Sequence, residues 1–485
     1  MKTIVRVCLI ALFILIAGFF TANFFISQKI QNLLDQEPAI SCDSFSINSF
    51  KGSLSLKKFE LSEPGRSLKI EKVDLNVSIV HYLLNKEILV ELIDAEDIDL
   101  KMNTSSQGNN ERKKDLELDI ATIEEVDLKD FNIQVLNQDK LLFTVNNIEV
   151  KASDVNWPLN GEHEWLDNES LQIKAEDLMY DMNDLHTISS GSFSYIHSVA
   201  EFTKFKMKPK YSKSEYIQYI EVEKDLIDLE AKSFSIFKPE FAKMDSTFQL
   251  GAKKIHIDSL KSNIYRDKTV TDDSSIKPLY SESLRNLDFK VKIDSILISE
   301  SELKYQELMK KNHQPGEIEF NSIDGHITNF HNMLGHDKPK IKAVIEAQFT
   351  EQSDIHFELN FVPDHENFHL RTKIQNTEDQ SVNGFFAPAI SMKLEGTIDI
   401  IATNFSGDDS ELNGDFRMAY QKLKLDVLRK DGSKNNFASL LSNVFVNNRN
   451  VNKTFRLERV KRDQTKSFWN YVWTFHLKGL KRSLL

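Results

Sequence analysis

The 485-residue sequence has little of several residue types that mark common classes of protein. Its two cysteines, Cys8 and Cys42, lie far apart, with Cys8 inside an apolar segment, so no intrachain disulfide framework is expected. Sixteen glycines and ten prolines are too few for a collagen-like or linker-like chain. The net charge of −12 lacks the basic excess that favours binding to nucleic acid. With 40% hydrophobic residues, including 33 phenylalanines, the chain is expected to fold around apolar side chains.

Motifs of several enzyme classes are also missing. The sequence contains no G-x-S-x-G, no glycine-rich phosphate-binding loop and no cluster of cysteines and histidines. His256 stands between two isoleucines, where a histidine on the surface of a sheet is the simplest interpretation. We therefore expect no catalytic residue, no cofactor and no metal, and predict that the protein is not an enzyme.

One short motif has the spacing of a zinc site. The residues His365-Glu366-Asn367-Phe368-His369 match the H-E-x-x-H pattern of zinc proteases, which requires a helix so that both histidines share one face. Pro363 precedes this motif, and the residues after it alternate as a strand. Residues four apart on a strand are separated by ~13 Å, too far to bind one ion. The motif therefore predicts a hairpin turn.

The longest uncharged run lies at the N-terminus. Val7–Ile26 contains twenty residues without a charge, about the length that a helix needs to cross a bilayer. A cleaved signal peptide is disfavoured because Phe20 stands two residues before Ala22, where a small residue is required. Basic residues precede the segment, so the positive-inside rule puts the N-terminus in the cytoplasm. We expect a single-pass anchor with the bulk of the chain across the membrane.

Alternation of apolar and polar residues dominates the rest of the chain. Such runs begin at residue 54 and recur as far as residue 427, and the longest takes every second position from 390 to 402. A period of two is typical of antiparallel strands in a half-buried sheet. Slips in the alternation, as at Glu71–Lys72, predict β-bulges or tight turns. No long helical period is found between Phe45 and Asp431, and roughly 13 residues per strand and turn predict about 30 strands.

The polar interruptions suggest an order of segments. A short helix is predicted at 80–86 and a flexible loop at 103–114. The polar segment 262–285 is predicted to be a surface loop or a division between two halves. The predicted organisation is a cytoplasmic start and anchor (1–26), a connecting segment (27–44), the first part of the β-region (45–261), the polar loop (262–285), the second part of the β-region (286–431) and a helical cap (432–485).

The C-terminal segment changes to a helical period. Its apolar stripe consists of Trp469, Val472, Trp473, His476, Leu477 and Leu480, and its basic side chains are Lys466, Lys478, Lys481 and Arg482. A helix that covers the edge of the sheet and an interfacial helix that touches a membrane or a membrane-bound partner both fit this pattern. A second short helix is predicted at 437–446.

Several of these segments resemble the AsmA-like family. The stretch Phe45-Ser-Ile47, followed by Phe50-Lys-Gly52-Ser-Leu54-Ser-Leu56 and Phe59-Glu-Leu61, is similar to the strand that follows the single membrane helix of those proteins. Leu394-Glu-Gly396-Thr-Ile398-Asp-Ile400 and Leu412-Asn-Gly414-Asp-Phe416 are similar to late strands of the family. The tail from Lys466 to Trp473 resembles C-terminal helices of anchored AsmA-like proteins of Bacteroidetes-type bacteria.

The resemblance implies a protein anchored in the inner membrane with its bulk in the periplasm. In that family a long, curled antiparallel sheet is thought to form a groove lined by apolar side chains. The resemblance also implies a link to phospholipid movement toward the outer membrane and to envelope biogenesis, with envelope proteins as possible partners. It supplies no catalytic residues.

The apolar face of such a sheet must be covered, whether by a barrel, by a sandwich or by acyl chains. Our first hypothesis is a groove that binds or conducts phospholipid, and the alternative is a scaffold for envelope assembly that transports nothing. A hydrolase or other envelope enzyme is a third class, which nothing in the sequence supports. The residues predicted to line the groove are Ile390, Met392, Leu394, Ile398 and Ile400.

Overall fold

The computed structural model describes residues 24–25, 27–29, 31–32, 38–85, 87–105, 120–156, 169–244, 247–335, 337–428 and 452–484. The predicted anchor, much of the predicted loop at 103–114 and the predicted helix at 437–446 lie largely or wholly outside these residues. Within them, no helix is both long enough and apolar enough to span a bilayer.

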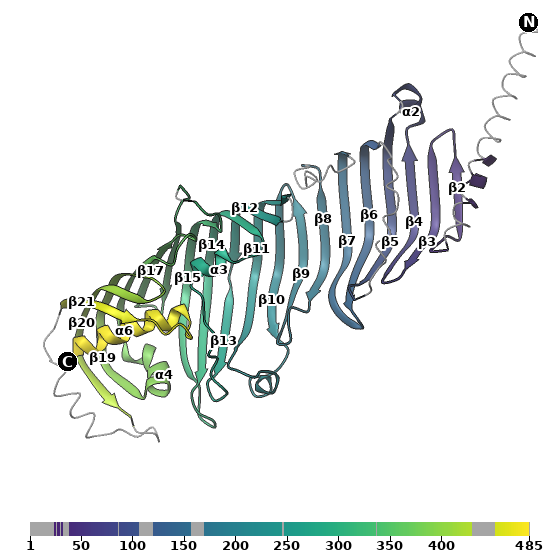
Figure 1. The fold of residues 1–485 in the computed structure, drawn as a ribbon. Helices are drawn as coiled ribbons and strands as arrows, with labels where there is room; N and C mark the ends of the chain where they lie inside the picture. The colour runs from purple at the N-terminus through teal and green to yellow at the C-terminus, as the bar shows by residue number, and fades with distance from the viewer. Residues whose placement is uncertain are drawn as a thin grey trace, which may run out of the picture. The chain divides into compact units, whose positions relative to one another are not determined.

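The described chain is mainly β, as predicted, and its strands belong to a large mixed sheet (Figure 1). Contacts divide it into two compact units: Met1–Asp181 with Ser189–Phe202, called unit 1, and Met182–Ile188 with Thr203–Leu485, called unit 2. The hairpin of β9 (His186–Ile196) and β10 (Val199–Pro209) contributes residues to both. Each unit is described by itself.

Unit 1 is a sheet with one short helix at the end of its strands. The strands are β1 (Ile40–Ser41), β2 (Ser44–Asn48), β3 (Ser53–Glu63), β4 (Arg66–Val77), β5 (Ile88–Asn103), β6 (Ile120–Asn137), β7 (Lys140–Asn156) and β8 (Gln172–Tyr180). The helix predicted at 80–86 is confirmed as α2 (Ile79–Asn85), which joins β4 to β5.

Unit 2 combines the later strands with helices. It contains η2 (Tyr216–Tyr219), β11 (Asp225–Met244), β12 (Thr247–Asp258), β13 (Lys261–Asp267), α3 (Tyr280–Arg285), β14 (Lys290–Leu308), β15 (Gly316–His331), β16 (Ile341–Gln348), β17 (Asp354–Phe361), β18 (Phe368–Glu378), α4 (Asp379–Ile390), β19 (Met392–Gly407), β20 (Glu411–Val427), β21 (Lys453–Lys461) and α6 (Phe468–Leu484). The polar segment 262–285, predicted as a loop, thus contains most of β13 and all of α3.

The prediction of a wholly antiparallel sheet was wrong. Most neighbouring strands are antiparallel, but β5 pairs with β6 in parallel, and β14 is parallel to both β12 and β13. A parallel neighbour requires the chain to return to the end where the previous strand began. Residues 268–289, including α3, make this return before β14. Alternation reports which face a side chain occupies, so it carries no signal for strand direction.

The strands are also longer and fewer than predicted. The described residues contain 21 strands, of which β11 has 20 residues. The reason is that slips in the alternation lie inside strands. The slip at Glu71–Lys72 is in the middle of β4, opposite Lys58 of β3, where pairing skips from Lys57↔Lys72 to Phe59↔Ile70. Such an interruption bends a strand without ending it.

These interruptions line up across unit 1. Lys58 on β3, Asp97 on β5 and Asp130 on β6 have left-handed φ angles of 50°, 54° and 51°. All three lie between the row of paired residues that contains Lys57 and the row that contains Phe59. Left-handed backbone in the middle of a strand is typical of bulges, which increase its twist and bend it. A transverse row of bulges therefore explains why the strands of this unit curve (Figure 1).

Candidate functional site

The apolar side chains of unit 1 form continuous rows across its strands. Paired positions place apolar residues next to one another from β3 to β7. One row consists of Phe59, Ile70, Ile98, Phe131 and Ile148, the next of Leu61, Leu68, Leu100, Ile133 and Val145, and a third of Leu56, Val73, Ala95, Leu128 and Val150. Five strands at ~4.8 Å spacing give an apolar face about 20 Å wide.

This face is covered less than a protein core. Ile98 and Ile148 are buried, while Leu100, Phe131 and Ile133 in the same rows stay half-buried. The apolar neighbours of the cluster around Ile148 all come from β6 to β9. Among the residues that the structure describes in unit 1, no helix packs over these rows; the main contacts of α2 with a strand are with β5. The described part of unit 1 is therefore a single layer with a partly open apolar face.

The opposite face of the same strands is charged. Lys129 on β6 lies 3.2 Å from an oxygen of Asp94 and 3.3 Å from an oxygen of Asp127. Hydrogen bonds to these two carboxylates raise the pKa of Lys129, so it is protonated at neutral pH. Lys69 pairs with Glu60 at 2.8 Å in the same way. Since one face carries solvated ion pairs, a ligand with long apolar chains has only the other face to bind.

The predicted groove residues lie in unit 2, and the structure separates them. Leu394 and Ile398 are buried in one large core cluster. Ile390 is the last residue of α4, so the predicted strand that includes it was wrong at this position. A register shift between Ile398 and Ile400 moves the core face to Ile401, so Ile400 is directed to the other side of the sheet.

Met392, the fifth predicted groove residue, begins β19 and is half-buried. The alternation from 390 to 402 therefore combined a helix end and a bulged strand into one run. Leu394 and Ile398 are the two predicted groove residues that share the core.

Helix α4 covers part of this apolar face. The side-chain amide of Asn383 donates a hydrogen bond from Nδ2 to the Leu394 carbonyl at 2.7 Å. Its Oδ1 accepts a hydrogen bond from the Leu394 N–H at 2.8 Å. Val382 of the same helix is buried in the cluster that contains Leu394. The prediction of no long helix between residues 45 and 431 missed α4, whose Gly384 and Pro388 give it a poor helix propensity.

Helix α6 covers the rest, and it crosses the strands instead of following the sheet edge (Figure 1). Phe468 at its start meets Phe368 of β18 with ring centroids 5.2 Å apart, and Phe475 stacks on Phe405 of β19 at 4.3 Å. Near its other end, Arg482 donates to the carbonyl of Arg456 on β21 at 2.8 Å. At this end of unit 2 the apolar face is a closed, two-layer core.

The helix predicted at the C-terminus is confirmed, but its buried stripe is rotated from the predicted one. The side chains that face the core are Phe468, Tyr471, Val472 and Phe475. Of the predicted stripe, Val472 is buried, Leu480 packs at the margin of the core, Trp473 and Leu477 are half-buried, and Trp469 is 52% exposed. Apolar residues surround most of this helix, so its periodicity alone did not fix which side meets the sheet.

His476 is the polar member of the predicted stripe. Its Nε2 lies 3.1 Å from Oγ1 of Thr372, and its Nδ1 lies 2.9 Å from the Val472 carbonyl. Burial lowers the pKa of His476, so the ring is neutral at neutral pH. The histidine therefore contributes a hydrogen bond between helix and sheet, and no charge.

The H-E-x-x-H segment forms a hairpin, as predicted. β17 and β18 pair up to Phe361↔Phe368, and His365 to Asn367 lie in the turn between them. Glu366 has a role that the sequence did not predict: Arg285 at the end of α3 bonds its carboxylate at 2.6 Å and the Pro363 carbonyl at 2.6 Å. The Arg285 guanidinium lowers the pKa of Glu366. The turn is thus tied to α3.

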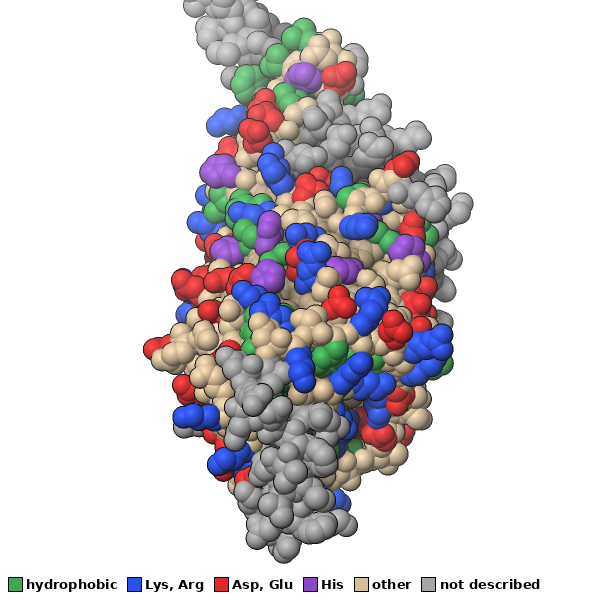
Figure 2. Space-filling model, turned by 90° about the vertical axis from the view of Figure 1, so that its left-hand side faces the viewer, with side chains coloured by type: hydrophobic (Ala, Val, Ile, Leu, Met, Phe, Trp, Pro, Cys, Tyr) green, Lys and Arg blue, Asp and Glu red, His purple; other side chains and the backbone are tan. Residues whose placement is uncertain are grey.

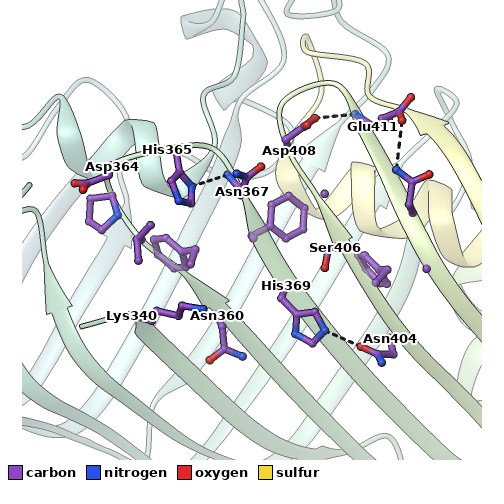
Figure 3. Close-up of a pocket in the computed structure, with 18 of the residues that line it drawn as sticks. Lys340, Asn360, Asp364, His365, Asn367, His369, Asn404, Ser406, Asp408 and Glu411 are labelled. Carbon is purple, nitrogen blue, oxygen red and sulfur yellow. Dashed lines mark hydrogen bonds between the residues drawn. The ribbon is translucent and has the colours of Figure 1, made fainter. Parts of the chain in front are cut away.

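The same turn lines an open pocket of about 780 Å³ on unit 2 (Figure 3). His369 of β18 and Asn404 of β19 face each other there, with Nε2 of the histidine 2.7 Å from the amide oxygen. Asp408 accepts backbone N–H groups of Ser410 and Glu411, and so shapes a turn. These hydrogen bonds connect neighbouring strands and hold a turn, so they account for the polar side chains as structural contacts.

The face of the molecule drawn in Figure 2 is mixed in charge. In the view of Figure 2, Lys and Arg side chains alternate with Asp and Glu, and hydrophobic side chains form only small separate groups. The described side chains of this face therefore form no broad basic or acidic surface for a polyelectrolyte.

Comparison with known proteins gives no family for this chain. No protein-family model matches the sequence, and no curated protein matches it. The class of protein is therefore defined by the fold alone: a large mixed β-sheet with an apolar face that is partly open in the described part of unit 1 and closed by α4 and α6 over the last strands of unit 2.

Proposed function

We propose that the apolar face of unit 1 binds the acyl chains of membrane phospholipids. The observation that carries the proposal is the contrast between the half-buried apolar rows of β3 to β7 and the fully covered core under α4 and α6. Each methylene group that moves from water to such a face contributes ~0.8 kcal/mol, so two acyl chains supply enough free energy for binding. The neighbouring rows offer a surface along which acyl chains can lie.

The proposal includes a place in the cell. The uncharged Val7–Ile26 segment supports a single-pass anchor in the inner membrane, with the bulk of the chain in the periplasm. In that setting the protein is an AsmA-like envelope protein that binds or conducts phospholipid and thereby supports outer-membrane biogenesis.

A second candidate function is a scaffold for envelope assembly that carries no lipid. The closed core of unit 2 supports it, because Leu394 and Ile398 have no open surface to offer a ligand. The two functions differ in what touches the apolar rows of unit 1.

Photo-crosslinking inside cells tests the proposal. The full chain carries p-benzoylphenylalanine at Leu100 on the apolar face or, as the matched control, at Lys101 on the opposite face of β5. We expect a phospholipid adduct at Leu100, detected by mass spectrometry of the purified chain, and none at Lys101. A third probe at Leu394 is expected to capture only peptides of α4 or α6.

The opposite result is equally clear. Crosslinks from Leu100 that reach only protein, in a chain that is folded and present at the normal level, would contradict lipid binding. The scaffold function would then be the better account.

A further inference from the structure

Helix α2 presents an apolar side to solvent at one end of unit 1. Val80, Leu83 and Leu84 are 67%, 62% and 77% exposed, and no residue of the helix is buried. Positions i, i+3 and i+4 lie on one side of a helix, so the three side chains form one apolar patch.

The polar residues of the helix occupy its other side and bond to each other. The amide Nδ2 of Asn85 lies 3.2 Å from Nδ1 of His81, and the His81 ring lies 3.6 Å from the carboxylate of Glu87. Within Ile79–Asn85 no Asp, Glu, Lys or Arg occurs, so the helix itself puts no such charge on its Val80 side. Burial within unit 1 therefore does not explain why the patch is apolar.

The turn between β2 and β3 lies beside the start of the helix. Gly52 has a left-handed φ of +67°, its carbonyl accepts the Val77 N–H at 2.9 Å, and a Cβ on it would lie 3.1 Å from Cγ1 of Ile79. The preceding turn residues Phe50 and Lys51 donate their N–H groups to the side chain of Asn48. The exposed Phe50 therefore belongs to a turn whose last residue, Gly52, lies next to the start of α2.

We infer that α2 and the adjoining turn insert into the interface of the lipid bilayer. The inference rests on the proposed membrane attachment of this chain and adds a second contact, made by the sheet end itself. An interfacial helix of this kind buries its apolar side ~5–10 Å into the boundary between headgroups and acyl chains.

The size and charge of the patch favour a bilayer over a protein. A stable protein interface needs about 800 Å² on each partner, more than a two-turn helix and one turn supply. A bilayer requires only a few apolar side chains to enter it. Lys51 is exposed beside the patch, where a cation is attracted to anionic lipid headgroups.

The chain outside the described residues also favours a bilayer. The uncharged segment ends at Ile26, and β1 begins at Ile40, so a short connection joins the proposed anchor to unit 1. A short tether holds α2 at a high effective concentration near the same membrane. Weak insertion then suffices to hold this end of the strands of unit 1 at the membrane.

Quenching of a fluorophore by brominated lipid tests the inference. The full chain, with Cys8→Ser and Cys42→Ser, is labelled with the fluorophore NBD at L84C and reconstituted in vesicles that contain brominated phosphatidylcholine. The control label is at D139C, an exposed turn residue at the other end of the strands. Because β5 has 16 residues, the two ends are about 50 Å apart.

We expect at least half of the NBD emission at position 84 to be quenched and less than one tenth at position 139. A further L83D substitution is expected to reduce the quenching at position 84 at least twofold. Equal quenching at both positions, or a shielded label at 84 that bromine does not quench, would overturn the inference. The latter result would indicate that protein covers the patch, either the N-terminal segment or a second copy.

The experiment also separates this inference from the proposed function. A chain that floats with vesicles and captures phospholipid at Leu100, but shows no quenching at 84, contradicts only the insertion of α2. A chain that does not float with vesicles contradicts the attachment and the insertion together.

Discussion

At the scale of the residue, Gly479 shows how closely α6 approaches the sheet. A Cβ on this glycine would lie 2.1 Å from Cδ2 of Phe416, whose side chain is completely buried on β20. The glycine therefore allows the helix backbone to lie directly on an aromatic ring. A glycine in a helix lowers its intrinsic stability by about 1 kcal/mol relative to alanine, so close packing is the reason for it here.

We predict that Gly479→Ala destabilises unit 2. In an exposed helix this change is stabilising, but here the methyl group overlaps Phe416, and overpacking costs about 1–3 kcal/mol. Urea unfolding followed by tryptophan fluorescence measures the effect, since Trp469 and Trp473 lie on α6. The control is Lys478→Ala, on the exposed neighbour, with an expected change below about 0.5 kcal/mol. A Gly479→Ala variant as stable as wild type would contradict the packing described.

At the scale of the element, α4 exists because the sheet supports it. Its sequence contains Gly384 and Pro388, and its helix continues to Ile390, directly before β19. Val382 packs into the core, and Asn383 satisfies both the N–H and the carbonyl of Leu394. Tertiary packing thus overrides a weak local propensity.

We predict that Asn383→Ala lowers the free energy of unfolding by about 2 kcal/mol or more, because it leaves two backbone groups of Leu394 without a partner. The matched control is Ser381→Ala in the same helix, where the hydroxyl is buried and has no hydrogen-bond partner in the described part of the chain. Its removal is expected to be neutral or slightly stabilising. Equal losses in the two variants, measured by the same urea titration, would show that the Asn383 bonds are unimportant.

At the scale of the whole molecule, the two units differ in how they bury apolar surface. Unit 2 has many side chains that are almost completely buried under α6, including Leu370, Phe405 and Phe416. In the described part of unit 1, the apolar rows are partly exposed. Regions with few buried apolar contacts open more easily than a dense core.

We predict that backbone amides of β3 to β5 exchange hydrogen at least tenfold faster than those of β18 to β20 in the purified chain. Added phospholipid is expected to slow exchange in β3 to β7 and to leave β18 to β20 unchanged, because only the former have an open apolar face. Hydrogen exchange with mass spectrometry measures both effects. Uniform protection, or protection by lipid only in unit 2, would contradict this difference between the units.

The sequence by itself determined the secondary-structure class and the alternation of apolar and polar side chains along the strands. A period of two shows directly which face of a sheet a side chain occupies, so the β-rich region and the hairpin at residues 365–369 were predictable. The C-terminal helix was predictable from its helical period, and α2 from the interruption of the alternation at residues 80–86. The row of bulges at Lys58, Asp97 and Asp130 was visible in the sequence only as slips in the alternation of apolar and polar residues.

Tertiary structure alone decided where the apolar face is open and where it is closed. The predicted site at 390–400 and the rows of unit 1 have the same alternation, but α4 and α6 pack over the former. Strand direction, the rotation of α6 and the position of a covering helix all depend on contacts between residues far apart in the chain. Local periodicity contains no information on those contacts, because it records only that a side chain must leave water.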